Sequence, residues 1–130
     1  MTSKPDEDDY EKLYLVSRLV YNGEIDAEKA SAKLSAILGS PEVYNKIIFS
    51  MYAGMKNGRV FQQSGGDESV VYFLRRIAQD EGPEALEKAL NAVYGYTGIK
   101  GSVGCPMPEL EDACDALKVI YGIRKKKKKK

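Results

Sequence analysis

Repeated stop and start signals constrain this chain to form short helices. Glycine after an apolar run favours the left-handed backbone that ends a helix, and proline is typical of a first helical turn. Five positions carry such signals: Gly23, Gly39, Gly58, Gly82 and Pro108. Between them, apolar residues recur every three to four positions, which is the period of a helix with one buried face. No segment sustains the alternation of a half-buried strand, so the sequence predicts an all-α fold.

These signals predict a compact bundle of five to six short helices. Asp26 and Ser40 are suitable N-cap residues, and Pro41 is suitable as a first helical residue. Most connections are short, which favours antiparallel neighbours. The longer connections are a loop at residues 58–66 and a glycine-rich loop at residues 95–107, before the last helix. The expected helices span residues 6–22, 27–38, 41–57, 67–81, 83–94 and 108–121.

The apolar periodicity also predicts which side chains are buried. In the third helix these are Val43, Ile47, Met51 and Met55. In the last helix they are Leu110, Ala113, Cys114, Leu117 and Ile120. We therefore expect Cys114 to be buried and reduced, and Cys105, in the preceding loop, to be the more reactive thiol.

The charge of the chain has two separate parts. Residues 1–123 contain 13 of the 20 basic side chains and all 19 acidic ones, a net charge of −6. The other basic side chains form one uninterrupted run: Arg124, Lys125, Lys126, Lys127, Lys128, Lys129 and Lys130. We predict a single helical domain at residues 1–123 and a disordered basic tail at residues 124–130 that does not support the fold.

Two interpretations of the basic tail remain open. As a native feature, it could bind nucleic-acid phosphates or an anionic membrane surface. It has no interleaved aromatic residues, which disfavours sequence-specific recognition of single strands. A bare lysine run is also typical of an added solubility tag, which would carry no native function.

The residue types needed for common catalytic sites are missing. The chain has no histidine, the most frequent general base, and two cysteines supply only half the ligands of a structural zinc site. Acidic residues cluster at positions 6–9 and 109–115, in the first turns of expected helices, where the helix dipole favours them. We therefore expect no enzyme activity, no metal site and no cofactor.

The glycine-rich part of the loop at residues 95–107, residues 95–104, is one candidate binding site. Gly95, Gly98, Gly101 and Gly104 stand at every third position, and such a backbone can wrap an anion with help from Lys100. Tyr94 and Tyr96 could anchor a protein partner. We expect helix five to hold Tyr94 and expect Tyr96 to become ordered only on binding. The alternative is that this segment is a flexible linker.

Tyrosines on the first helix form a second candidate surface. Tyr10, Tyr14 and Tyr21 share one helical face, and tyrosine is favoured at protein interfaces. The alternative is that this face forms the edge of the core.

These observations favour a non-enzymatic protein-binding or assembly module, such as a subunit, regulator or inhibitor of a larger complex. The alternative is a nucleic-acid-associated protein acting through the basic tail. We expect a cytoplasmic protein, because residues 1–9 lack the apolar segment of a secretory signal, and no apolar run is long enough for a membrane span. Homo-oligomerisation remains open.

Overall fold

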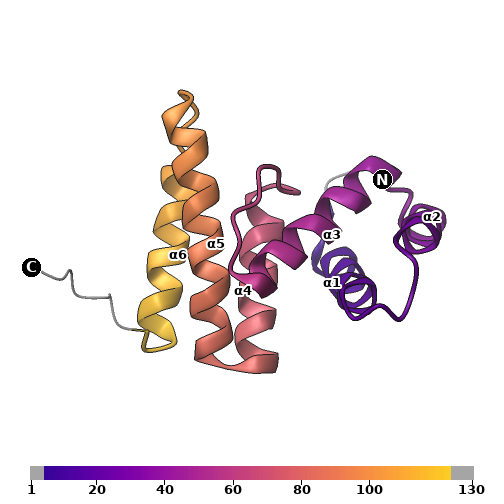
Figure 1. The fold of residues 1–130 in the computed structure, drawn as a ribbon, viewed down its shortest axis with the longest axis horizontal. Helices are drawn as coiled ribbons and strands as arrows, with labels where there is room; N and C mark the ends of the chain where they lie inside the picture. Colours follow the sequence, from indigo (N-terminus) through magenta and orange to yellow (C-terminus); the bar gives the residue numbers. More distant parts are fainter. Residues whose placement is uncertain (1–4, 124–130) are drawn as a thin grey trace, which may run out of the picture.

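The computed structural model describes residues 5–123, which form six helices and no strand (Figure 1). The predicted all-α fold is therefore confirmed. None of the helices in this range is long and apolar enough to span a membrane. The basic tail, residues 124–130, lies outside the described residues. The helices are α1 (Glu7–Tyr21), α2 (Ala27–Leu38), α3 (Glu42–Asn57), α4 (Asp67–Glu81), α5 (Pro83–Ser102) and α6 (Pro108–Ile120).

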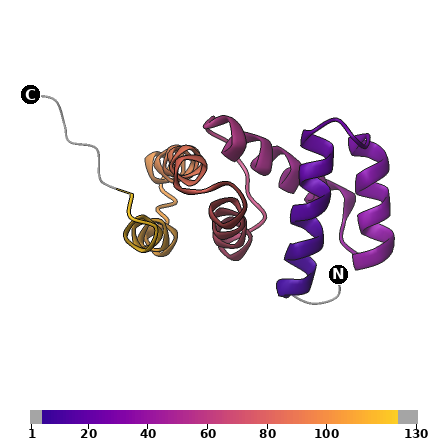
Figure 2. The same cartoon turned by 90° about the horizontal axis from the view of Figure 1, so that it is seen from below.

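The helices form two groups with α3 between them. α4, α5 and α6 lie side by side, whereas α1 and α2 run across that direction on the other side of the molecule (Figures 1 and 2). α3 contacts α1 and α2 in one group and α5 in the other, and α1 also contacts α4. The central helix of the fold is therefore α3.

Aromatic rings from three helices meet in the core. The ring of Tyr14 in α1 makes edge-to-face contacts with Tyr52 of α3 and Phe73 of α4, at centroid distances of 5.4 and 5.2 Å. All three side chains are fully buried. Such ring pairs contribute about 0.5–1.5 kcal/mol beyond the area they bury, so this cluster helps to join α1, α3 and α4.

Local signals predict most helix ends correctly. The Asp26 carboxylate accepts hydrogen bonds from the backbone N–H groups of Glu28 and Lys29 at 3.0 and 3.2 Å, the predicted cap of α2. Gly39 and Gly58 adopt the left-handed conformation after α2 and α3, with φ of 74° and 67°. These ends depend on residues close in sequence, which is why periodicity and capping rules locate them.

The predicted cap of α3 is wrong. Pro41 occupies the cap position instead of the first helical turn, and Ser40 makes no capping bond. The Ser40 hydroxyl instead donates to Oδ1 of Asn45 at 2.7 Å. The Asn45 amide donates to the Ser31 carbonyl at 2.9 Å and to the Ser35 hydroxyl at 3.1 Å. Asn45 is fully buried, and its hydrogen bonds connect α3 to α2 and to the segment between them.

The predicted buried face of α3 is only partly correct. Met51 and Met55 are buried, but Val43 is 71% exposed and Ile47 is half-buried. The buried face is rotated and includes Ile48. Three helices contact α3 from different directions. Those contacts decide which of its side chains are buried, so a single apolar stripe in the sequence does not predict the buried face. α6 shows a smaller deviation: the predicted Leu110, Cys114 and Leu117 are buried, Ala113 is half-buried, and Ile120 is exposed.

The predicted glycine-rich loop at residues 95–107 is only partly correct, because residues 95–102 continue α5 as helix. Each glycine costs a helix interior about 1 kcal/mol relative to alanine, and this local preference suggested a break. On the side of α5 that faces the core, Val93, Tyr96 and Thr97 are buried. Tertiary burial thus outweighs the weak local propensity, and the connection to α6 shortens to residues 103–107.

We expect Asn45→Ala to lower the free energy of unfolding by about 1–3 kcal/mol, because it removes the hydrogen-bond partners of buried polar groups. Urea denaturation followed by circular dichroism measures this loss. Asn91→Ala, at an exposed position of α5, is the matched control and should change stability by less than about 0.5 kcal/mol. Equal losses in the two variants would contradict a structural role for the Asn45 bonds.

Candidate functional site

Tyr96 is part of the core in this structure, so the expectation that it becomes ordered only on binding is wrong. Its side chain is 4% exposed, and its ring stacks on Phe61 at a centroid distance of 4.8 Å. Its hydroxyl lies 3.0 Å from the Ser64 hydroxyl, within hydrogen-bond distance. Tyr96 therefore attaches the segment after α3 to the C-terminal half of α5.

Tyr94 points to a different neighbour. Its hydroxyl donates to the Asp115 carboxylate of α6, and the Lys118 ammonium lies 4.9 Å from its ring centroid. Burial and the bond to Asp115 raise the pKa of the Tyr94 phenol above its ordinary value. Tyr94 contacts α6 whereas Tyr96 contacts the segment after α3, so the two tyrosines do not form the single contact surface predicted for them.

The other candidate residues of the predicted loop, Gly98, Lys100 and Gly101, lie on α5. Gly98 and Gly101 are exposed, and an added Cβ at either would meet nothing within 4 Å. The Lys100 ammonium lies 5.8 Å from the Tyr96 ring centroid. Because these residues are helical, their backbone N–H groups follow the helix and do not wrap an anion as the predicted loop would.

The tyrosines of α1 belong mainly to the core, as the alternative interpretation held. Tyr10 and Tyr14 are buried. Tyr21 is 38% exposed, and its hydroxyl donates to Oδ1 of Asn57 at 2.8 Å. The rings of these tyrosines pack mainly against other helices, so α1 does not present the predicted tyrosine face to a partner.

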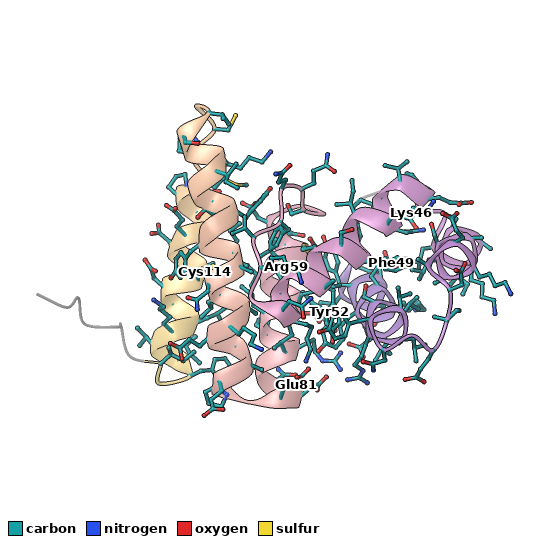
Figure 3. The ribbon with its side chains drawn as sticks, in the orientation of Figure 1. Lys46, Phe49, Tyr52, Arg59, Glu81 and Cys114 are labelled. Atoms are coloured by element: carbon teal, nitrogen blue, oxygen red, sulfur yellow. The ribbon has the colours of Figure 1, made fainter. Side chains whose placement is uncertain are left out.

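The structure instead contains a groove of about 790 Å³ that the sequence analysis did not predict. We call it the α3/α5 groove. It is lined by the exposed stripe of α3, the segment Arg59–Gln63 that follows α3, and Lys100 of α5. Lys46 lies toward the start of α3 and Arg59 just beyond its end (Figure 3). Lys100 is the only lining residue that the sequence predicts as a binding residue, whereas Val43 and Ile47 are predicted as buried.

Close backbone contacts hold the wall formed by residues 59–63. The Arg59 N–H donates to the Gly54 carbonyl at 2.8 Å, and a Cβ on Gly54 would lie 2.8 Å from the Arg59 carbonyl oxygen. At α5, a Cβ on Gly95 would lie 2.3 Å from Cγ2 of Val60. Glycines at these two positions therefore allow the wall to approach both helices, and Phe61 fixes it through Tyr96.

The groove combines apolar and cationic groups. Val43 and Val60 are exposed, by 71% and 45%, and Ile47 is half-buried. Three cationic side chains and no carboxylate line the same surface. The cationic side chains are Lys46, Arg59 and Lys100.

The groove has a signal in the amino-acid composition of the chain. Residues 43–66 and 88–108 contain no aspartate or glutamate, although residues 1–123 contain 19 of them. Every residue that lines the groove belongs to one of these two segments. Composition reveals the two acid-free segments, but only the packing of α5 on α3 brings them together.

A second hollow, of about 390 Å³, lies where α1, α4 and α6 begin. Five acidic residues line it: Asp6, Glu7, Asp67, Glu68 and Glu109. Acids at the first turns of helices interact favourably with the helix dipole, so the fold itself accounts for their presence.

The part of the chain that the structure describes contains no candidate metal site. No group of three or more Cys, Asp or Glu side chains there could hold a metal ion. Cys105 is exposed and Cys114 is buried, as predicted.

Comparisons of this chain with protein-family models, curated proteins and solved structures found no match. The geometry and chemistry of the α3/α5 groove are therefore the basis for assigning a function.

We expect alanine substitutions at Gly98 and Gly95 of α5 to have opposite effects on the free energy of unfolding. Gly98→Ala should raise the free energy of unfolding by about 0.5–1 kcal/mol, because helix propensity improves and the added Cβ meets open space. Gly95→Ala should lower it, because its Cβ would displace Val60. Thermal unfolding of both variants measures the difference. Destabilisation by Gly98→Ala would show that this position has a contact which the structure lacks.

The two thiols should differ in alkylation rate. Burial raises the pKa of the Cys114 thiol to about 12, so almost none of the reactive thiolate is present at pH 8. Iodoacetamide at pH 8 should therefore modify Cys105 first in the native protein. Peptide mass spectrometry locates the adduct, and unfolding in guanidinium chloride should expose Cys114. Equally rapid labelling of both native thiols would contradict the packing of α6.

Proposed function

We propose that this protein is a non-enzymatic, cytoplasmic binding module that holds a polypeptide segment of a partner in the α3/α5 groove. It would act as a subunit, regulator or inhibitor of a larger complex. The observation that supports this most directly is the exposure of Val43 and Val60 in a concave surface with one constrained wall. A cytoplasmic location fits two free cysteines in a helical domain that needs no disulfide.

Apolar burial supplies a reason for a partner to bind. Covering a valine side chain that is exposed in the free protein contributes on the order of 1 kcal/mol or more. The volume of the groove falls within the range of about 300–1,000 Å³ that ligand pockets typically have, which suits a few anchoring side chains. Because Gly54, Gly95 and the Phe61–Tyr96 stack constrain one wall, binding would require little ordering of the protein.

The composition of the groove supports binding over catalysis. Its lining has no carboxylate or thiol, and the whole chain has no histidine. General acid–base and nucleophilic catalysis depend on such groups held within hydrogen-bond distance of each other. The amides and hydroxyl that do line it, from residues such as Ser50, Asn57 and Gln62, orient ligands but rarely activate them.

The nucleic-acid alternative is less favoured. It depends on residues 124–130, whereas residues 1–123 carry a net charge of −6 and repel phosphate. The basic tail alone would provide a contact that is strongly salt-dependent and independent of the groove.

We expect Val43→Asp and Val60→Asp each to weaken partner binding at least about tenfold, or about 1.4 kcal/mol. Each change places a charge where an apolar contact forms. The partner is first isolated from the source cell with the full chain as bait, and affinities are then measured by isothermal titration calorimetry. Circular dichroism checks that each variant remains folded.

Val119→Asp is the matched control, because Val119 is 81% exposed on α6 and lies outside the groove. Its affinity should equal that of the unchanged protein. Equal affinities for all three variants, combined with a loss on removing residues 124–130, would favour the tail-based alternative. If the occupant of the groove is a second copy of this chain, light scattering of the protein alone will give the molar mass of a dimer.

A further inference from the structure

We infer that the segment held in the α3/α5 groove is an acidic amphipathic helix. This inference rests on the proposed function and adds the chemistry and conformation of the partner segment. Two observations carry it: the charge distribution around the groove, and the shape of the α3 stripe that forms its floor.

The groove is a cationic surface on an acidic domain. Among residues 5–123, Arg59 and Lys100 have no carboxylate within 4.0 Å. Lys46 already pairs with Glu28 at 2.7 Å, so it contributes less free charge. Arg59 and Lys100 are therefore available to pair with carboxylates of a bound ligand. Carboxylates on that ligand would meet no like charge in the groove lining, although they would be repelled elsewhere on the domain.

The floor of the groove has the spacing of a helix-packing ridge. Val43, Ile47, Ser50 and Gly54 follow one another at intervals of three or four residues on α3. They extend over about 16 Å at 1.5 Å per residue, which matches three turns of a second helix. The small side chains at Ser50 and Ala53 allow such a helix to approach closely, while Val43 and Ile47 contact its apolar face.

A helix fits this surface better than an extended strand. A strand binds by adding to the edge of a sheet, and residues 5–123 contain no sheet. The backbone groups of α3 are used within the helix, so an extended peptide would find few main-chain partners there. A bound helix satisfies its own backbone and offers side chains at the required spacing.

A polypeptide also fits better than a nucleic acid. Val43, Ile47 and Val60 provide apolar area that a phosphate backbone cannot cover. An extended polyanion would reach past the groove to the acidic surface, whereas the carboxylates of a short helix can be confined to positions opposite Arg59 and Lys100.

Selection from a displayed library of helical peptides tests this inference directly. The library fixes a leucine face at helical spacing and randomises the polar positions. Three full-length baits are used: the unchanged chain, Arg59→Glu with Lys100→Glu, and Lys33→Glu with Arg75→Glu. Lys33 and Arg75 are exposed outside the groove. The two double variants have the same net charge and the same basic tail, so tail-mediated binding is matched.

We expect the unchanged chain and the Lys33→Glu/Arg75→Glu control to enrich aspartate and glutamate at the polar positions. The Arg59→Glu/Lys100→Glu variant should lose this enrichment and favour lysine and arginine. A selected acidic peptide should bind that variant at least about tenfold more weakly than it binds the control. Equal acidic enrichment on all three baits would assign the preference to the tail and overturn the inference.

One further arm separates the two proposals. Selected peptides are tested for binding to Val43→Asp. Peptides that need Val43 but show no acidic preference would overturn the inference and leave the groove as a binding site. Peptides that are indifferent to Val43→Asp would contradict the proposed function itself. Displacement of a selected peptide by a single-stranded oligonucleotide of equal charge, at equal concentration, would favour nucleic acid and overturn the acidic-helix inference.

Discussion

The structure depends above all on the burial of α3 between the other helices. The ring of Tyr52 shows this most clearly, with centroids of Tyr14, Tyr21 and Phe73 at 5.4, 5.7 and 6.0 Å. A chain of this length has room for one core, and a central helix covered by α1, α2 and α5 lets both groups of helices share it. The face of α3 that these helices leave uncovered is the floor of the α3/α5 groove.

A charged cluster sets the position of α1 on α4 beside this core. The Arg76 guanidinium contacts the carboxylates of Glu11 and Asp80 and lies 4.6 Å from the Tyr14 ring centroid. The Tyr72 hydroxyl also donates to Glu11. The hydrogen bonds from Tyr72 and Arg76 lower the pKa of the Glu11 carboxyl. Because α3 packs on α1 and α5 packs on α4, this junction also affects how α3 and α5 meet.

The placement of charge along the chain follows from the same arrangement. Acids occupy the first turns of helices, where the dipole stabilises them, and Asp6 and Asp26 act as caps. They are missing from the two segments that meet at the groove. A domain with net negative charge thus presents a local surface where Arg59 and Lys100 are available beside exposed valines. This combination is the basis of the proposed binding function.

The sequence by itself determined the helical class, most helix ends and the burial of Cys114, because capping residues, glycines and apolar periodicity act over a few neighbouring positions. Only the tertiary structure decided the rotation of α3, the helical continuation of α5 and the burial of Tyr96. Each of these depends on contacts between residues far apart in sequence. Gly95 illustrates the limit: its local preference predicts a loop, whereas its close contact with Val60 makes it a packing position within a helix. The groove has the same origin, because two acid-free segments become one surface only when α5 packs against α3.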